Sequence, residues 1–500
     1  MASFFAPKHR SVVPRWRLFA STSGLRELDN APRGPVALPD APVDQLRDWE
    51  AFGTVWHATD LISAAVVSMQ PETALDAAKF LTSRAASVQP SALALAQRIL
   101  NPGDGALDEQ YDWDWPIMIR KLRSSVRRDP RSAMQWADLA LAHTVLGNRT
   151  QAIRAMTVAH ALAPDNRFVL RSAARCFLHW GEPDRAHQLL KASPATLSDP
   201  WLLSAEIAMA SARHRRSRLF TEGRRMVKSG DFSSYDISEL ACGLGSAEFE
   251  AGSRRHAVPL LTRSMERPTE NAVAQVEWVF NKDNRPPPAL DAVENVPRLY
   301  EAMASEHYFK GEWDDAVHCA RQWLEDQPFS SRPADLGSYA ASLLGRYSEA
   351  VGLLVGARAS NPDDQMILNN LTYFSVLAGD VSGAQRWMNL VKWDQVEAAD
   401  LPIFTATSGL LKFRLGDAEA GRAAYVRAVR DGIERRDARI EAIALMNFSR
   451  EEFLSGHYER GEERLRQARA AAKRAHGEDI KTMLERLEAR RDMPSRTSSI

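Results

Sequence analysis

Residues 311–384 read GEWDDAVHCARQWLEDQPFSSRPADLGSYAASLLGRYSEAVGLLVGARASNPDDQMILNNLTYFSVLAGDVSGA, and this stretch repeats one short pattern at a fixed spacing. Gly311, Gly345 and Gly379 stand 34 residues apart, and an alanine follows each glycine after five residues. A proline follows each of the first two glycines after 17 residues. Self-similarity at this period indicates stacked repeat units rather than one globular core.

The spacing of small and large apolar residues predicts two antiparallel helices in each unit. In residues 133–164, Trp136, Ala140 and His143 would share one helical face. Two helices approach closely only where a small residue lies at the crossing and larger neighbours fill the space beside it. Gly147 would end the first helix because a residue without a Cβ adopts the left-handed conformation cheaply. The trailing proline cannot continue the second helix.

The pattern resembles that of the tetratricopeptide repeat (TPR) family. Further units in this register are marked by Leu170, Ala173, Ala174, Phe177, Gly181, Ala186 and Leu190, by Leu244, Gly245, Gly252, Ala257 and Leu261, and by Ala316, Ala350 and Ala384. The resemblance implies an all-α fold, namely a right-handed α-α superhelix (a TPR-like solenoid) with a helical N-terminal cap. Gly416 and Gly456 follow at intervals of 37 and 40 residues, which predicts longer helices or loops there.

Composition and prolines divide the chain. We expect a flexible or docked N-terminal arm (1–42), a helical cap with a linker (43–130), N-terminal TPR-like repeats (131–280), a Pro-rich interruption (281–292), C-terminal TPR repeats (293–456), C-terminal capping helices (457–492) and a disordered tail (493–500). The arm is basic and rich in proline, and Pro7 and Pro14 argue against the amphipathic helix of a transit peptide. In the cap, Trp49, Phe52, Val55, Trp56 and Leu61 would form one apolar stripe.

Charge and cysteine content narrow the function classes. Lys plus Arg and Asp plus Glu both number 64, so no overall field draws the chain to nucleic acid or to an anionic membrane. No apolar run approaches the roughly 20 residues of a membrane span. The three cysteines show no CxxC spacing, which favours a reducing, cytoplasmic location and neither a disulfide framework nor a zinc site. The preference for Arg over Lys suits a bacterial, GC-rich genome.

Catalytic signatures are absent from the sequence. There is no GxxxxGK phosphate loop, no HExxH pair and no GxSxG elbow, so we expect no enzyme, no cofactor and no metal. Asp112 and Asp114 alternate with tryptophans, and a loop whose tryptophans dock on the cap is favoured over a metal site, since further ligands are missing. His179 and His187 show no ligand spacing.

The family resemblance implies that the first helix of each unit lines a concave groove. At the corresponding positions, the candidate partner-binding residues are Arg298, Glu301, Ser305, Tyr308, Arg332, Asp335, Tyr339, Ser342, Asn369 and Tyr373. Tyrosine and arginine enrich recognition surfaces because they combine contact area with directed hydrogen bonds. The alternative is that the tyrosines complete the packing between repeats. A chaperone-tail receptor is not favoured, because Asn370 fits its carboxylate clamp but Asp335 and Tyr339 do not.

Two other surfaces leave alternatives open. The cluster Arg213, His214, Arg215, Arg216, Arg218, Arg224, Arg225 and Lys228 could contact phosphates, but a charged outer face that meets an acidic protein is favoured. The C-terminal apolar stripe Leu465, Ala468, Ala472, Ile480, Met483 and Leu487 would seal the last repeat, and a homodimer contact is the alternative.

The leading functional hypothesis is an interaction scaffold or adaptor that binds a protein or peptide segment in its concave groove. A peptide-responsive sensory regulator that releases an effector is the alternative. A nucleic-acid accessory protein acting through the Arg213–Lys228 cluster is the third and least favoured hypothesis.

Overall fold

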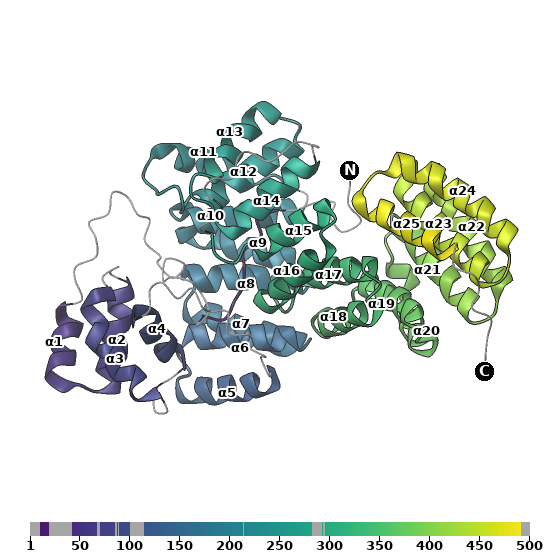
Figure 1. Ribbon diagram of the computed structural model, residues 1–500. Helices are drawn as coiled ribbons and strands as arrows, with labels where there is room; N and C mark the ends of the chain where they lie inside the picture. The colour runs from purple at the N-terminus through teal and green to yellow at the C-terminus, as the bar shows by residue number, and fades with distance from the viewer. Residues whose placement is uncertain are drawn as a thin grey trace. The chain divides into compact units, whose positions relative to one another are not determined.

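The computed structural model describes residues 11–19, 43–67, 71–85, 88, 90–100, 115–213, 215–282, 293 and 296–491. Within these ranges every regular element is a helix, and Figure 1 shows them following one another as antiparallel pairs. The chain divides into two compact units, here called the N-terminal unit (described residues 11–279, 293 and 296) and the C-terminal unit (described residues 280–282 and 297–491). This division falls beside the expected Pro-rich interruption (281–292). Residues 283–292 of that interruption lie outside the described residues.

The helices of the N-terminal unit are α1 (Val43–Phe52), α2 (Val55–Val67), η3 (Pro71–Ala74), α3 (Leu75–Thr82), α4 (Pro90–Leu100), α5 (Trp115–Arg128), α6 (Ala133–Val145), α7 (Arg149–Leu162), α8 (Arg167–His179), α9 (Pro183–Ala192), η5 (Pro194–Leu197), α10 (Pro200–Ala212), α11 (Phe220–Ser229), α12 (Ser238–Glu250), α13 (Arg254–Ser264) and α14 (Glu270–Lys282). The helices of the C-terminal unit are α15 (Tyr300–Lys310), α16 (Trp313–Asp326), α17 (Ser331–Leu343), α18 (Tyr347–Ser360), α19 (Gln365–Ala378), α20 (Val381–Asn389), η6 (Trp393–Gln395), α21 (Leu401–Arg414), α22 (Ala418–Glu434), α23 (Ala438–Leu454), α24 (Tyr458–Ala475) and α25 (Glu478–Arg491).

Local chemistry sets the ends of these helices. Gly147, Gly311, Gly345 and Gly379 lie in the turns of their hairpins with φ between 71° and 91°, which is the left-handed region that glycine enters without strain. At helix starts, the side chains of aspartates accept hydrogen bonds from backbone N–H groups of the first turn, as Asp364 does from Met366 and Ile367. The TPR-like register of glycine, alanine and proline therefore corresponds to real hairpins.

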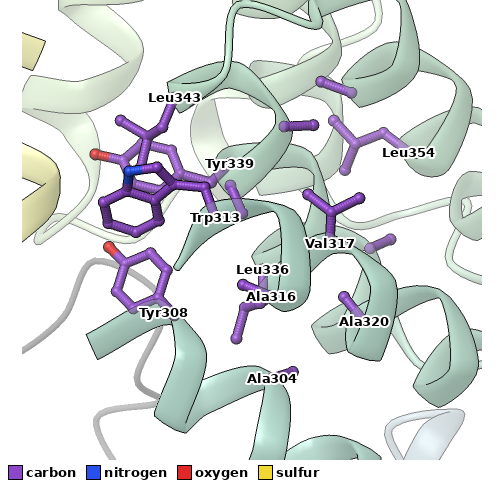
Figure 2. Packing of buried hydrophobic residues seen from close by; sticks show 14 of the residues in the cluster. Ala304, Tyr308, Trp313, Ala316, Val317, Ala320, Leu336, Tyr339, Leu343 and Leu354 are labelled. Carbon is purple, nitrogen blue, oxygen red and sulfur yellow. The ribbon is translucent and has the colours of Figure 1, made fainter. Parts of the chain in front are cut away.

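The small residues lie at the helix crossings, as the sequence predicts. Ala316, Ala350 and Ala384 have no exposed surface. Figure 2 shows Ala316 and Ala320 of α16 among the larger side chains of α15, α17 and α18. These alanines allow the two helices of a hairpin to approach closely, and the buried leucines and aromatics fill the remaining volume.

The first helices of successive hairpins contact one another and form an inner layer. The contacts join α6, α8, α10 and α12 in the N-terminal unit and α15, α17, α19, α21 and α23 in the C-terminal unit. The helix α10 is buried continuously from Pro200 to Ala210, whereas α7 buries only one stripe. Each unit is thus a TPR-like α-α solenoid, which confirms the predicted fold class.

The structure accounts for the longer spacings near the C-terminus and differs from the sequence analysis at two hairpins. The longer period near the C-terminus is accounted for by η6 and by α22, α23 and α24, which have 17 to 18 residues each. The boundary expected at residue 456 cuts the hairpin of α23 and α24 at its turn glycine. The hairpin of α10 and α11 was missed, because the loop between these helices carries arginines and no turn glycine.

The helices α1 to α4 pack around a core of their own. Its fully buried members include Leu61, Ile62 and Leu81. The predicted stripe is wrong in part, because the side chains of Phe52 and Trp56 are 64% and 69% exposed. Helix α1 ends before Gly53, which has a φ of 57°, so the helical periodicity of α1 does not continue into α2. That these helices cap the solenoid stays a prediction.

Other expectations concern residues that are not described. Residues 1–10 and 20–42 of the arm, the Asp112 to Asp114 loop and the tail 493–500 lie outside the described ranges. None of the described helices combines the length and the apolar character that spanning a membrane requires.

Candidate peptide-binding grooves

The predicted tyrosine ladder lies on the inner helices of the C-terminal unit, but it is not open to solvent. Tyr308 on α15 and Tyr339 on α17 are 5% and 7% exposed, and their ring centroids are 6.2 Å apart. Figure 2 shows both rings beside Trp313, whose centroid is 5.5 Å from that of Tyr308. Tyr308 and Tyr339, which the sequence analysis placed on one surface, are therefore neighbours in the structure.

Helix α25 covers this surface. The hydroxyls of Tyr308 and Tyr339 both donate to Asp479 Oδ2, over 2.9 Å and 3.1 Å. Arg439 on α23 donates from Nη1 to the other oxygen of the same carboxylate over 3.2 Å. Burial, with the Asp479 carboxylate adding to it, raises the pKa of Tyr339 well above its ordinary value, so the hydroxyl remains a donor.

The same helix closes the end of α17. Arg486 donates from Nη1 to the carbonyls of Ser342 and Leu343, over 2.8 Å and 2.7 Å. These are orphan carbonyls of a helix C-terminus, which need partners when they are shielded from water. Helix α25 of the same chain therefore covers the tyrosines that the sequence analysis assigned to partner binding. This arrangement favours the alternative in which the tyrosines complete the packing.

The remaining candidates also have partners inside the unit. Arg332 Nη2 lies 2.5 Å from Glu301 Oε1, and Arg298 Nη1 lies 3.9 Å from Asp326 Oδ1. Four further candidates donate hydrogen bonds within the unit. The hydroxyls of Ser305 and Ser342 donate to the backbone carbonyls of Glu301 and Tyr339, the amide of Asn369 donates to Asn370 Oδ1, and the hydroxyl of Tyr373 donates to Asn447 Oδ1. Burial and the nearby Asp364 raise the pKa of Asp335 well above its ordinary value. Whether any of these residues binds a partner stays a prediction.

A small pocket remains between α17, α19, α23 and α25. Tyr339, Tyr373, Asn447, Arg450 and Arg486 are among its lining residues, and its volume is about 70 Å³. A space of this size holds a few water molecules. It is too small for a peptide segment.

The inner layer of the N-terminal unit is covered differently, by the extended segment of residues 11–19, here called the arm segment. Val12, Trp16 and Leu18 are 1%, 0% and 7% exposed, and Pro14 is also buried. Val13 and Arg15 are only half-buried, so the side chains from Val12 to Trp16 point alternately to the protein as in a β-strand, and Arg17 is buried as well. The expected arm therefore includes a docked portion.

Two backbone contacts anchor the ends of the arm segment. Asn271 on α14 donates from Nδ2 to the carbonyl of Val13 over 2.9 Å. The backbone N–H of Phe19 donates to Asp138 Oδ1 on α6 over 2.7 Å. The segment thus runs across the inner helices from α14 to α6, against the chain order of the repeats.

Side-chain contacts add charge and aromatic packing. Arg17 Nη2 lies 2.8 Å from Glu270 Oε1, and these side chains are 6% and 16% exposed. Phe19 packs edge-on against Phe168 of α8, with ring centroids 5.5 Å apart. Asp138 and Phe168 belong to α6 and α8, the first helices of their hairpins, and Asn271 and Glu270 belong to α14, which follows the last described hairpin of the unit.

Acidic side chains give this groove its electrostatic character. Burial raises the pKa of Asp138 to about 7, against the hydrogen bond from Phe19, which lowers it. Burial also raises the pKa of Glu239 on α12, and Glu270 adds to the rise, whereas Arg171 and Arg15 oppose it. Arg171 Nη2 lies 3.0 Å from Glu239 Oε2. The two arginines of the arm segment therefore lie where carboxylates gather.

The sequence analysis missed this groove although a signal was present. Val12, Pro14, Trp16 and Leu18 occupy alternate positions, which is the period of an extended segment with one buried face, and Val13 is the apolar exception between them. Pro7, Pro14 and the positive charge argue against a helix, but they do not distinguish a docked extended segment from a flexible one. Which helices the segment would meet was not encoded in any local pattern.

Four arginines of the Arg213–Lys228 cluster are paired with carboxylates. Arg216 and Arg224 share Glu248 Oε1, at 3.3 Å and 2.8 Å, while Arg213 pairs with Asp184 and Arg225 with Glu222. This internal neutralisation does not favour a phosphate-binding surface.

Among the residues that the structure describes, one group of possible metal ligands occurs at the turn between α15 and α16. His307, Glu312 and Asp315 each place one suitable atom within 4.8 Å of the others. His307 Nδ1 and Glu312 Oε2 are 2.6 Å apart, and this direct contact accounts for the closeness.

Comparisons with known proteins add the following. No protein-family model matches the chain, and no curated protein matches its sequence. Among solved structures, the chain is similar to yeast Tom70 with 11% identity and a TM-score of 0.32, over 90% of this chain and 98% of that one. It is also similar to the APC/C hetero-tetramer Cut9-Hcn1 with 12% identity and a TM-score of 0.33, over 90% and 93% of the two chains. With scores of this size, the TPR-like architecture rests on the helices described above.

Proposed function

We propose that this protein is a protein–protein interaction scaffold that binds an extended segment of a partner in the groove of its N-terminal repeats. The observation that carries the proposal is the arm segment, which lies extended across α6, α8, α12 and α14 and is held at both ends through its backbone. Side chains that bond to a peptide's main chain bind extended segments whatever their exact sequence. This moves the proposed site from the C-terminal repeats, where α25 covers the tyrosines, to the N-terminal repeats.

A cytoplasmic location, a bacterial source and a role without catalysis belong to the same proposal, because they follow from the composition and the missing catalytic motifs. The proposal includes no role for nucleic acid.

Binding in trans tests the proposal directly. The probe is a fluorescently labelled synthetic peptide of residues 11–19, titrated against the full chain and against a full chain with Trp16→Ala and Arg17→Ala, here called the arm-weakened chain. We expect saturable binding to the arm-weakened chain with at least a tenfold lower dissociation constant than to the native chain, because the native arm competes for the groove.

Two further variants locate the binding. Asn271→Ala in the arm-weakened chain removes the donor to the peptide carbonyl and should weaken binding. Asn361→Ala is the matched control, since Asn361 donates to the backbone of Phe329 in the C-terminal unit, and it should leave binding unchanged. Absence of peptide binding to every chain would refute the proposal.

The second candidate function is a sensory regulator. The observation that supports it is the arm segment, which already lies in the groove that a partner would enter. A partner that enters the groove must release the arm, and such a release is a switch. A regulator predicts that the peptide changes the radius of gyration of the native chain beyond the change made by Trp16→Ala and Arg17→Ala alone. A pure scaffold predicts no such further change in small-angle scattering.

A further inference from the structure

The chemistry of the arm segment points to the class of partner that the N-terminal groove accepts. Three features of the segment meet the groove, namely alternating apolar side chains, a fully buried tryptophan and a buried arginine.

Charge is the most selective of the three features. Asp138, Glu239 and Glu270 come from α6, α12 and α14 and lie along the path of the segment. Glu239 has an internal partner in Arg171, whereas Glu270 is paired with Arg17 of the segment at 2.8 Å. A segment without cations would leave the carboxylates of Glu239 and Glu270 facing each other with less compensation, which costs free energy in a desolvated groove.

The tryptophan supplies contact area. Trp16, near the middle of the arm segment, has no exposed surface. A large aromatic side chain buried at the centre of a short bound segment is the usual anchor of a peptide interface. The proline two residues earlier favours the extended backbone that the groove requires.

We propose that the groove of the N-terminal unit is a receptor for cationic, tryptophan-containing extended segments of a partner protein, and that the arm segment is a built-in copy of such a ligand. This inference rests on the proposed function and adds the chemistry of the partner to it. The pattern that a partner would share is an apolar residue, a spacer, proline, a spacer, tryptophan, arginine and a second apolar residue, as in residues 12–18.

The test uses the arm-weakened full chain and variants of the 11–19 peptide. We expect the peptide with Arg17→Glu to bind about 30-fold more weakly or worse than the native peptide, since truncating or reversing one side of a buried charge pair has effects of this size. The peptide with Trp16→Ala should also lose at least tenfold, whereas Ser11→Ala, at a half-buried position outside the pattern, should change binding less than threefold.

A charge exchange separates recognition from a loss of folding. Glu270→Arg in the arm-weakened chain should reject the native peptide and accept the peptide with Arg17→Glu. Asp231→Arg is the matched control, because Asp231 is exposed in the same unit and outside these contacts, and it should leave both affinities as they are.

The outcomes distinguish the two proposals. If the native peptide binds but Arg17→Glu and Trp16→Ala bind equally well, the groove binds extended segments without this selectivity, and the inference is overturned while the proposed function stands. If no peptide binds, both fail. If the native chain has twice the mass of one chain in solution and Trp16→Ala with Arg17→Ala halves it, the occupant is the arm of a second copy, which also overturns the inference.

Discussion

At the residue scale, Asp479 concentrates several interactions in one carboxylate. It accepts from Tyr308, Tyr339 and Arg439 and is 3% exposed. Asp479→Asn keeps the shape but leaves the Arg439 guanidinium without its counter-charge in a largely desolvated place. We expect a loss of about 3 kcal/mol in the free energy of unfolding, measured by urea denaturation. Glu478→Gln, one residue earlier and exposed, should change it by less than about 0.5 kcal/mol.

Two glycines inside helices test the packing at a crossing. A Cβ on Gly245 of α12 would lie 2.8 Å from Leu261, whereas a Cβ on Gly352 of α18 would meet nothing within 4 Å. Gly352→Ala should therefore stabilise the protein by about 1 kcal/mol through helix propensity. Gly245→Ala should destabilise it by about 1–2 kcal/mol, because overpacking outweighs that gain. Equal shifts in the unfolding midpoints of the two variants would contradict the packing argument.

The buried carboxyl of Asp138 predicts a pH dependence. Its pKa in the folded protein is about 7 and its ordinary value is 3.8, because burial disfavours the charged form. Between these values the folded state binds more protons than the unfolded state, so stability falls as the pH rises from about 4 to about 7 and is then constant. Relative to Asp138→Asn, which keeps an acceptor oxygen, the native chain should lose roughly 4 kcal/mol at most across this window. Urea unfolding at several pH values measures the difference, and parallel profiles for the two chains would contradict it.

At the scale of single elements, α25 and the arm segment play comparable parts. Each one lies on the inner helices of its own unit, the first as a helix and the second as an extended strand-like segment. The inner layers consist of first helices that are buried on most sides, so a further element must shield the side that the hairpins leave open. Neither element belongs to the hairpin repeat itself.

The dependence of α25 on its apolar face can be measured. Met483 packs against the tyrosine cluster, and its sulfur lies 3.7 Å from the hydroxyl oxygen of Tyr339. Met483→Asp should release α25 from α17 and α23, with hydrogen exchange of the amides in residues 478–491 rising at least tenfold. The amides of α15 to α22 should remain protected. Lys481→Asp, at an exposed position of the same helix, should leave the exchange of α25 nearly unchanged.

The apolar stripe of α24 and α25 is used within the chain. Leu465, Ala468, Ile480 and Leu487 are at most 6% exposed. This packing corresponds to the sealing role that the sequence analysis favoured for the C-terminal helices. A homodimer contact through the stripe would require these side chains to leave their present positions.

At the scale of the whole molecule, two units with separate cores should open separately. Cys176 and Cys242 are buried in the N-terminal unit and Cys319 is buried in the C-terminal unit. Burial raises the pKa of Cys176 to about 12, so its thiol reacts slowly until the unit opens. The labelling rates of the three thiols therefore measure the opening of the two units separately.

A core substitution in one unit uses this difference. Ala350 has no exposed surface at the crossing of α17 and α18. Ala350→Glu places a charge there and should destabilise the C-terminal unit by about 3 kcal/mol or more. Thiol labelling at moderate urea should then accelerate at Cys319 and stay unchanged at Cys176 and Cys242. Acceleration at all three thiols would mean that the units unfold as one.

The sequence by itself determined the repeat and most of the hairpins. A 34-residue period of glycine, alanine and proline is a local property, because each residue acts through its own backbone or its own crossing. The same locality allowed Tyr308 and Tyr339 to be placed on one face. It failed for Phe52 and Trp56, where a turn interrupts the helical count.

Only the tertiary structure decided what covers the inner helices. Asp479 meets Tyr308 across 171 residues of chain, and Asn271 meets Val13 across 258. Contacts at such separations depend on the summed rotation of many hairpins, which no short motif specifies. For this reason the sequence indicated a groove and the kind of side chains in it, while the folded chain determined that its own helix and its own arm lie there.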